Sequence, residues 1–396
     1  SRHQHRISFT LSLPPGEWAC GVCRQQVDDN YGAYSCSKGE AYFVHSKCAV
    51  DRKVWDGIEL DGVPEEDDLI DDGEPFKRIA DGIILHPFHS HNLRLKIIKA
   101  YDEYNYCRGC ALPIYEGQFY SCMEMECKFI LHQSCASAPR MKRHPLHPYP
   151  LTLKVAIKGP DNAKGIFKCS VCDRKGTCFF YEHRIGEISF QLDLRCATIT
   201  EPFEYQGHKH PLFLASDDNM PECVMCINGS SNFLLNCMEC DYVICFGCVT
   251  FPYKVKYKHD SHFLTICDGK EVIDQPDWCE ACEIRIVENG FPGFIGKKFK
   301  FFYKCSEYCC TTLHVECLFG ENIYMKPGNS IKDCIAKRSY LIKDGRYIWV
   351  EFQILFNNSL SRPSCSECLC RCPFSIFFKG CNTIYCSWDC ITYIVR

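Results

Sequence analysis

The chain has 396 residues, among them 34 cysteines and 15 histidines, and a formal net charge of −4 at pH 7. This slightly negative charge argues against a nucleic-acid backbone as the main partner, because such binding rests on a basic patch. No apolar run reaches the roughly 18 residues of a membrane-spanning helix, so we expect no membrane span. The length alone suggests two to four domains, but the spacing of the cysteines favours a larger number of smaller units.

Cysteine is frequent enough to form the scaffold of this chain, through either disulfide bonds or zinc. Disulfide frameworks do not need histidine, yet every one of the 15 histidines lies in or beside a cysteine motif. CxxC pairs that alternate with HxxC are typical of zinc ligands. We therefore expect zinc, and reduced thiols favour a cytoplasmic or nuclear location. The first motif begins at His3, so we expect that residues precede Ser1 in the natural protein.

The same order of ligands occurs five times: a leading histidine pair, a CxxC, a middle pair and a closing HxxC or its equivalent. We call these segments copies 1 to 5 and expect them at residues 1–55, 81–140, 141–200, 201–252 and 253–322, with an acidic linker at 56–80 and a tail at 323–396. The candidate metal ligands are His3, His5, Cys20, Cys23, Cys36, Glu40, His45 and Cys48 in copy 1; His86, His89, His91, Cys107, Cys110, Cys122, Cys127, His132 and Cys135 in copy 2; His144, His147, Cys169, Cys172, His183, Glu187, Asp193 and Cys196 in copy 3; His208, His210, Cys223, Cys226, Cys237, Cys240, Cys245 and Cys248 in copy 4; and His259, His262, Cys279, Cys282, Cys305, Cys309, His314 and Cys317 in copy 5.

Local patterns predict the same secondary structure in each copy. A short alternating run follows the leading histidines, as in Asn92-Leu93-Arg94-Leu95, and predicts a strand. An apolar residue such as Tyr120 lies two positions before the third ligand, and this segment predicts another strand. The closing HxxC places both ligands on one side of a short helical turn. A unit of this size cannot fold on an apolar core alone, so zinc must supply about 10–16 kcal/mol per structural site.

The repeated frame resembles the plant divergent C1 family, also called DC1 or Cys/His-rich C1. The resemblance rests on the HxH start, the CxxC, the tyrosine before the middle pair and the HxxC-Ala end, as in Cys135-Ala136, and it covers residues 3 to about 320. The tail also matches the family, through Lys326-Pro327-Gly328 and Arg371-Cys372-Pro373. The resemblance implies a tandem array of five small α+β, zinc-stabilised C1-like units followed by a cysteine-rich, zinc-binding tail.

C1 relatives interleave two zinc sites, and the resemblance implies the same division here. One site would use the CxxC and the closing pair, and the other would use the leading histidines and the middle pair. In copy 2 these sets are Cys107, Cys110, His132 and Cys135, and His89, His91, Cys122 and Cys127.

Several ligand assignments stay open at this point. His86 competes for a place in the second set of copy 2, and His144 is an alternative donor shared between copies 2 and 3. Glu40 and the pair His183 and Glu187 either bind zinc or mark lost sites, and Asp193 replaces a histidine. With two ions per copy and one in the tail, we expect about ten or eleven zinc ions.

The linker and the tail differ from the copies. Residues 56–79 are acidic and rich in turn-forming residues, which is typical of a solvated linker. A strand is expected at 347–352. One further zinc is expected on the tail cysteines, with Cys372 competing for a place: Cys365, Cys368, Cys372, Cys386 and Cys390.

The resemblance implies a non-enzymatic zinc-binding repeat protein that docks protein partners in plant signalling or stress response. A diacylglycerol-binding C1 sensor is an alternative, although Gly117-Gln118 reverses the Gln-Gly order of such domains. A chromatin reader or ubiquitin ligase related to PHD or RING fingers is another, but it leaves the leading histidines without a role. No catalytic residues and no organic cofactor are expected, because the complete copies offer four ligands to each metal and leave no open position.

Overall fold

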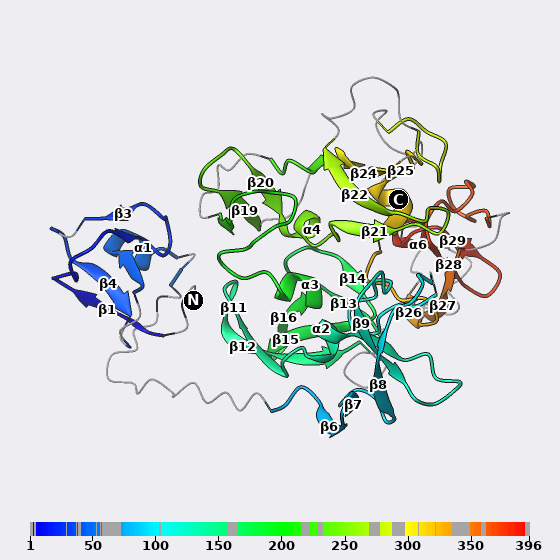
Figure 1. The fold of residues 1–396 in the computed structure, drawn as a ribbon, viewed down its shortest axis with the longest axis horizontal. Coiled ribbons are helices and arrows are strands. Elements are labelled where there is room, and N and C mark those ends of the chain that lie inside the picture. Colours follow the sequence, from blue (N-terminus) through cyan, green and yellow to red (C-terminus); the bar gives the residue numbers. More distant parts are fainter. Residues whose placement is uncertain are drawn as a thin grey trace, which may run out of the picture.

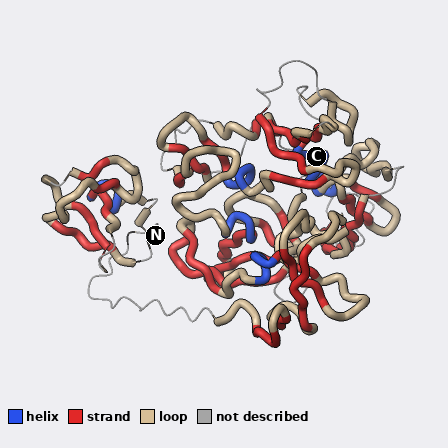
Figure 2. Tube along the Cα trace, in the orientation of Figure 1, coloured by secondary structure: helices blue, strands red, loops and turns tan. Residues whose placement is uncertain are grey.

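A computed structural model places the chain in a series of small antiparallel sheets, with one short helix described in each copy and one in the tail (Figures 1 and 2). The structure describes residues 3, 5–28, 30–36, 38, 41–52, 54–55, 57, 73–102, 104–156, 165–215, 222–227, 233–268, 278–286, 298–307, 309–320, 322–334, 349–357 and 362–392. Glu40 and most of the predicted acidic linker lie outside the described residues. Small modules made mostly of sheet are therefore the building blocks of the described part of the chain.

Copies 1 and 2 confirm the strand predicted after the leading histidines. In copy 2 that strand is β8 (Asn92–Ile97), the middle strand of a five-stranded sheet, between β7 (Ile83–Leu85) and β9 (Gln118–Cys122). The elements of copy 1 are β1 Ile7–Thr10, β2 Trp18–Ala19, β3 Gln26–Val27, β4 Ala33–Cys36, β5 Phe43–His45 and α1 Ser46–Ala49. Those of copy 2 are β6 Lys77–Ala80, β7 Ile83–Leu85, β8 Asn92–Ile97, β9 Gln118–Cys122, β10 Ile130–His132 and α2 Gln133–Ala136.

Copies 3 and 4 differ in the length of the hairpin that precedes the helix. In copy 3, β15 (Phe179–Ile185) and β16 (Ile188–Asp193) pair without interruption to the tip of the hairpin, whereas the equivalent strands of copy 4 are shorter. The elements of copy 3 are β11 Met141–His144, β12 His147–Val155, β13 Phe167–Lys168, β14 Lys175–Gly176, β15 Phe179–Ile185, β16 Ile188–Asp193 and α3 Leu194–Ala197. Those of copy 4 are β17 Leu212–Leu214, β18 Cys226–Ile227, β19 Leu234–Cys237, β20 Val243–Cys245 and α4 Phe246–Val249.

Copy 5 and the tail each form a four-stranded sheet, of order β21-β22-β24-β25 and β26-β27-β28-β29. The elements of copy 5 are β21 Lys254–Lys256, β22 Phe263–Asp268, β23 Lys298–Phe299, β24 Phe301–Cys305, β25 Thr312–His314 and α5 Val315–Phe319. Those of the tail are β26 Ser330–Cys334, β27 Trp349–Phe356, β28 Ile376–Lys379, β29 Ile384–Tyr385 and α6 Trp388–Thr392. Strand β27 overlaps the predicted strand at 347–352. In the described part of the chain, no helix has the length and apolar character needed to cross a membrane.

Copies 2 to 5 share one apolar core. Buried side chains form a continuous cluster from Ile84 in copy 2 to Tyr324 after copy 5, whereas copy 1 and the tail have separate clusters. Two buried tyrosines link neighbouring copies, because Tyr181 and Tyr303 donate hydrogen bonds to the carbonyls of Pro139 and Pro252 at 2.7 and 2.6 Å. Copies 2 to 5 are therefore not independent folding units, and unfolding of one copy can destabilise its neighbours.

The tail and copy 1 join this array in different ways. The tail is tied to copy 3 by backbone hydrogen bonding between Thr177 and Tyr324 at 3.0 Å. Copy 1 lies beside the array in Figure 1. Its Arg24 reaches Glu201 at 2.6 Å and lies 4.7 Å from the centroid of the Phe213 ring. The Glu201 side chain is only 4% exposed, so this ion pair is shielded from solvent.

Candidate metal centres

The CxxC pairs of copies 1, 2, 3 and 5 and of the tail are set in a tight turn that directs both thiols to the same side. In copy 2, Ala111 donates its N–H to the carbonyl of Cys107 at 2.9 Å, and Cys107 donates its own N–H to Leu112 at 2.8 Å. Ala111 has a φ of 60°, in the left-handed region. The same hydrogen bonds and a left-handed residue recur at Arg24, Asp173, Glu283 and Leu369. Leu369 lies in the tail, so the tail repeats the turn of the copies, a relationship that sequence analysis missed.

A second backbone contact fixes the turn against the strand that brings the next ligand. In copy 2, Arg108 donates its N–H to the carbonyl of Ile130 at 2.7 Å, two residues before His132. The equivalent donor–acceptor pairs are Gly21–Phe43, Ser170–Gln191, Val224–Val243, Glu280–Thr312 and Ser366–Ile384, at 2.6–3.0 Å. This register places the closing pair opposite the CxxC, and we call the resulting clusters the inner sites.

The inner sites bring four ligand atoms together. In copies 1, 2 and 4 these atoms lie within 4.8 Å of one another. In copy 5, His314 Nδ1 lies 3.4 Å from Cys282 Sγ and 3.8 Å from Cys317 Sγ, and the sulfur of Cys279 accepts the His314 N–H. The four-residue sets are Cys20, Cys23, His45 and Cys48; Cys107, Cys110, His132 and Cys135; and Cys223, Cys226, Cys245 and Cys248.

The inner clusters have the electrostatics of cation sites. Burial opposes ionisation of Cys107, but contacts with Cys110 and Cys135 outweigh it and hold the pKa of Cys107 well below its usual value. Burial likewise opposes protonation of His132, yet Cys110 and Cys107 raise its pKa to about 11. The low pKa of Cys107 means that its neighbours stabilise the thiolate, and the raised pKa of His132 reflects the negative charge of the sulfurs, which a divalent cation would neutralise.

Copy 3 builds its inner site with a carboxylate. The Asp193 carboxylate caps α3, because Oδ1 accepts the N–H groups of Arg195 and Cys196 at 2.9 Å. This leaves Oδ2 facing the thiols, 3.2 Å from Cys172 Sγ. Burial and the neighbouring Cys169 raise the pKa of Asp193 to about 7. The aspartate thus occupies the place of the histidine in copy 2, with one oxygen fixed and the other directed at the metal position.

The tail gathers its cysteines in an inner-type cluster. Cys386 Sγ lies 3.7 Å from Cys368 and 3.5 Å from Cys390, and Cys365 contacts both Cys386 and Cys390. Cys372 is fully buried and also contacts Cys386, so five thiols compete for the ligand positions.

A second kind of cluster, which we call the outer site, joins the leading pair to the middle pair. In copy 2, His89 Nε2 lies 3.2 Å from Cys122 Sγ and 3.5 Å from Cys127 Sγ, and His91 Nδ1 lies 3.8 Å from Cys122. Copy 4 repeats this arrangement with the same ring atoms. There His208 Nε2 lies 3.3 Å from Cys240, and His210 Nδ1 lies 3.6 Å from Cys237.

The first histidine of each complete pair rests on an aromatic ring. The ring centroids of His89 and Phe129 are 4.1 Å apart and nearly parallel, and those of His208 and Tyr242 are 4.0 Å apart. This contact orients Nε2 toward the sulfurs and shields the cluster on one side.

Copy 1 has the same stack but a partly described outer site. His3 lies 4.1 Å from the Tyr42 ring, and His5 Nδ1 lies 3.7 Å from Cys36 Sγ. The fourth candidate, Glu40, lies outside the described residues.

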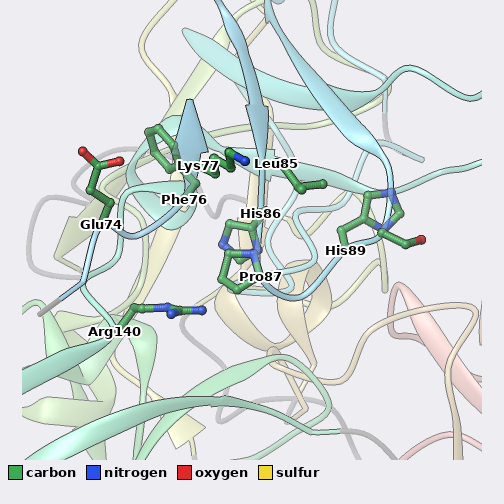
Figure 3. A pocket seen from close by; sticks show the side chains of 9 residues that line it. Glu74, Phe76, Lys77, Leu85, His86, Pro87, His89 and Arg140 are labelled. Carbon is green, nitrogen blue, oxygen red and sulfur yellow. The ribbon is translucent and has the colours of Figure 1, made fainter. Parts of the chain in front are cut away.

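His86 lies apart from the outer cluster of copy 2. Its ring is buried against Phe179, and its Nδ1 accepts the N–H of Phe88 at 3.2 Å. Burial and the nearby His89 and Arg140 lower its pKa to about 4. His86 lines a pocket of about 410 Å³, together with Arg140 and other residues (Figure 3). Its neutral ring thus serves packing, and the two ligand places fall to His89 and His91.

Copy 5 replaces one predicted outer ligand by its neighbour. His262 Nδ1 lies 3.3 Å from Cys309 Sγ, and Cys309 lies 2.9 Å from both Cys305 Sγ and Asp260 Oδ2. The structure therefore places Asp260, and not the exposed His259, beside the other three. The signal in the sequence was the one-residue spacing of the pair, because Asp260-x-His262 matches His89-x-His91 and the HxxH interpretation does not.

Copy 3 does not assemble its four outer candidates. His144 Nε2 donates to the carbonyl of Ile199 at 3.1 Å and its Nδ1 accepts the N–H of Leu146 at 3.3 Å, so both ring nitrogens are used. His183 stacks on Tyr149, which stands where His91 stands in copy 2.

The positions of the other two outer candidates of copy 3, His147 and Glu187, follow from the register of its strands. His147 stacks on Phe190 as His89 stacks on Phe129, and its ring centroid lies 4.9 Å from that of His183. Glu187 is exposed in the tight turn between β15 and β16. Because this hairpin continues in register to its tip, it lacks the loop that carries the fourth ligand in copy 2. Neither is His144 shared with copy 2, since its nitrogens are already paired.

The remaining described cysteines lie outside these clusters, and none of the described cysteines forms a disulfide. Cys178 is buried, and burial raises its pKa well above the usual value. The others are half-buried or exposed: Cys267, Cys310, Cys370 and Cys381.

The donor sets fit zinc, which prefers four thiolate, imidazole or carboxylate ligands in tetrahedral arrangement. Comparison with known families agrees with this chemistry. The family model described as C1 domain matches residues 1–49 and 87–136, and the model described as C1 domain-like, C-terminal, matches residues 352–391. No curated protein and no solved structure gives a significant match. The resemblance to divergent C1 zinc fingers predicted from the motifs is therefore confirmed for copies 1 and 2 and for the tail.

Proposed function

We propose that this C1-type zinc-finger chain is a non-enzymatic scaffold that binds protein partners in plant signalling or stress response. The observation that carries the proposal is the fused array, in which several four-ligand clusters hold copies 2 to 5 around one core. Such an array offers a large and rigid surface to a partner.

The ligand count supports a structural role for the metals. A catalytic zinc keeps one position open for water or substrate, whereas the complete clusters here converge with four protein ligands. The CxxC thiols are engaged in the same clusters, which argues against thiol–disulfide exchange. The inner ligands of copy 4 are all buried, so substrate has no path to that metal position.

Affinity capture from the source tissue tests the partner. The baits are the wild-type chain and a Cys223→Ser variant, which removes an inner ligand of copy 4. We expect a protein that binds the wild type, fails to bind the variant, and binds again when both partners are purified and mixed with zinc. Zinc-dependent turnover in an insulin-reduction assay, or flotation only with diacylglycerol-containing vesicles, would contradict the scaffold proposal and favour an enzyme or a lipid sensor.

A further inference from the structure

We propose that Asp260, His262, Cys305 and Cys309 form a zinc site in copy 5, and that this site exchanges its metal faster than the outer sites of copies 2 and 4. The inference rests on the zinc-binding part of the proposed function and not on the partner. It assigns a ligand that the repeated histidine pattern conceals.

The first argument is the position of Asp260 in the fold. Its N–H donates to the carbonyl of Tyr257 at 3.1 Å, as the N–H of His89 donates to His86 at 3.0 Å and that of His208 to Tyr205 at 2.9 Å. Asp260 therefore occupies the turn position of the first outer histidine.

The second argument is the orientation of its carboxylate. Oδ1 accepts the N–H of His262 at 2.8 Å, and Oδ2 lies 2.9 Å from Cys309 Sγ. One oxygen is thus fixed by the backbone while the other faces the ligand cluster. The two carboxylate oxygens of Asp193 in copy 3 are divided in the same way, because Oδ1 caps a helix while Oδ2 faces Cys172.

A third observation shows that the surroundings change together with the ligand. The position that carries Phe129 in copy 2 and Tyr242 in copy 4 is Thr311 in copy 5. The aromatic ring that supports a histidine is replaced by a side chain that hydrogen-bonds the Asp260 carboxylate. A threonine at this position is therefore suited to a carboxylate ligand.

The faster exchange follows from exposure and ligand type. Two ligands of this site are exposed, His262 with 45% of its side chain and Cys309, whereas the outer sites of copies 2 and 4 each have one exposed ligand, His91 and Cys240. Carboxylate oxygen is a harder ligand than imidazole and suits zinc less well. Copy 5 also lacks the aromatic ring that orients the first outer histidine in copies 2 and 4.

Chelator competition on the full chain tests this inference, with zinc loss followed by native mass spectrometry and a chromogenic chelator. We expect one zinc to leave the wild type in an early phase, at least tenfold faster than the others. Asp260→Ala should bind one zinc fewer, and Asp260→His should keep the full count while slowing the early phase. The matched control is His259→Ala, which should behave as wild type.

Three results would overturn the inference, and a fourth would refute the proposed function instead. If Asp260→Ala keeps every zinc, or if His259→Ala loses one, Asp260 is not the ligand. If the early phase is absent from a fully loaded wild type, the site is not labile. A chain that binds no zinc at all would refute the zinc scaffold itself. Circular dichroism of each variant establishes that the rest of the chain is folded.

Discussion

The inner and outer sites of this protein differ in how much their ligands and local structure vary from copy to copy. The inner sites share one strand contact and one short helix in all copies and in the tail, and one turn in copies 1, 2, 3 and 5 and in the tail, although the first ligand of the closing pair changes between histidine, aspartate and cysteine. The outer sites have two histidines in copies 2 and 4, an aspartate in copy 5 and an incomplete set in copy 3. In copy 4 the inner ligands are all buried, whereas Cys240 of the outer site is exposed.

This difference indicates that the position of a metal site in the fold determines whether its ligands can be changed or lost. An inner site lies where the helix meets an apolar core, which copies 2 to 5 share and which copy 1 and the tail each have for themselves, so its loss removes packing as well as ligands. An outer site fastens a surface hairpin, and a continuous β-hairpin can take its place, as in copy 3. The account is therefore tested best by variants that damage one kind of site and leave the other intact.

The largest contrast is expected between Cys135→Ser and Cys127→Ser in copy 2. Cys135 belongs to the inner site, and its loss removes up to the roughly 10 kcal/mol that a structural zinc contributes. Because copies 2 to 5 share a core, protease cuts should extend beyond residues 81–140. Cys127→Ser should lower Tm less and leave the array folded. Limited proteolysis and thermal unfolding measure both, and equal damage by the two variants would contradict the distinction.

A second contrast concerns Asp193 in copy 3. Asp193→Ala should lose one zinc and also about 1 kcal/mol of helix capping. Asp193→Asn retains a capping oxygen but lacks the carboxylate charge, so it should weaken zinc binding and cost less stability. Native mass spectrometry and urea unfolding separate the two effects. Retention of zinc by Asp193→Ala would mean that the carboxylate is only a helix cap.

The smallest contrast pairs His89→Ala with His147→Ala. His89→Ala should lower the zinc count by one, because Nε2 lies among the outer ligand atoms. His147→Ala should leave the count unchanged and cost about 1 kcal/mol from the lost stacking on Phe190. Zinc analysis of both variants tests this prediction. Loss of one zinc in His147→Ala would mean that copy 3 does have an outer site.

The sequence was sufficient to predict the strands after the leading histidines and the helical turn at each closing pair. Spacing alone was not sufficient to identify the ligands at His86, His144 and His259, because the sequence does not distinguish a histidine that packs or faces solvent from one that binds metal. What distinguishes them is the partner of each ring nitrogen, which depends on the fold. The shared core was also beyond reach, since residues such as Tyr181 link copies through contacts that no repeat pattern specifies.

Native mass spectrometry of the full chain, purified without chelator, tests the central claim most directly. Inner sites in all copies and in the tail, with outer sites in copies 1, 2, 4 and 5, predict about ten zinc ions, or about nine if copy 1 lacks its outer ion. Removal of the His147 and His183 side chains together should leave that number unchanged. A count of about eleven that falls by one in this double variant would contradict the account, because copy 3 would then hold two metals.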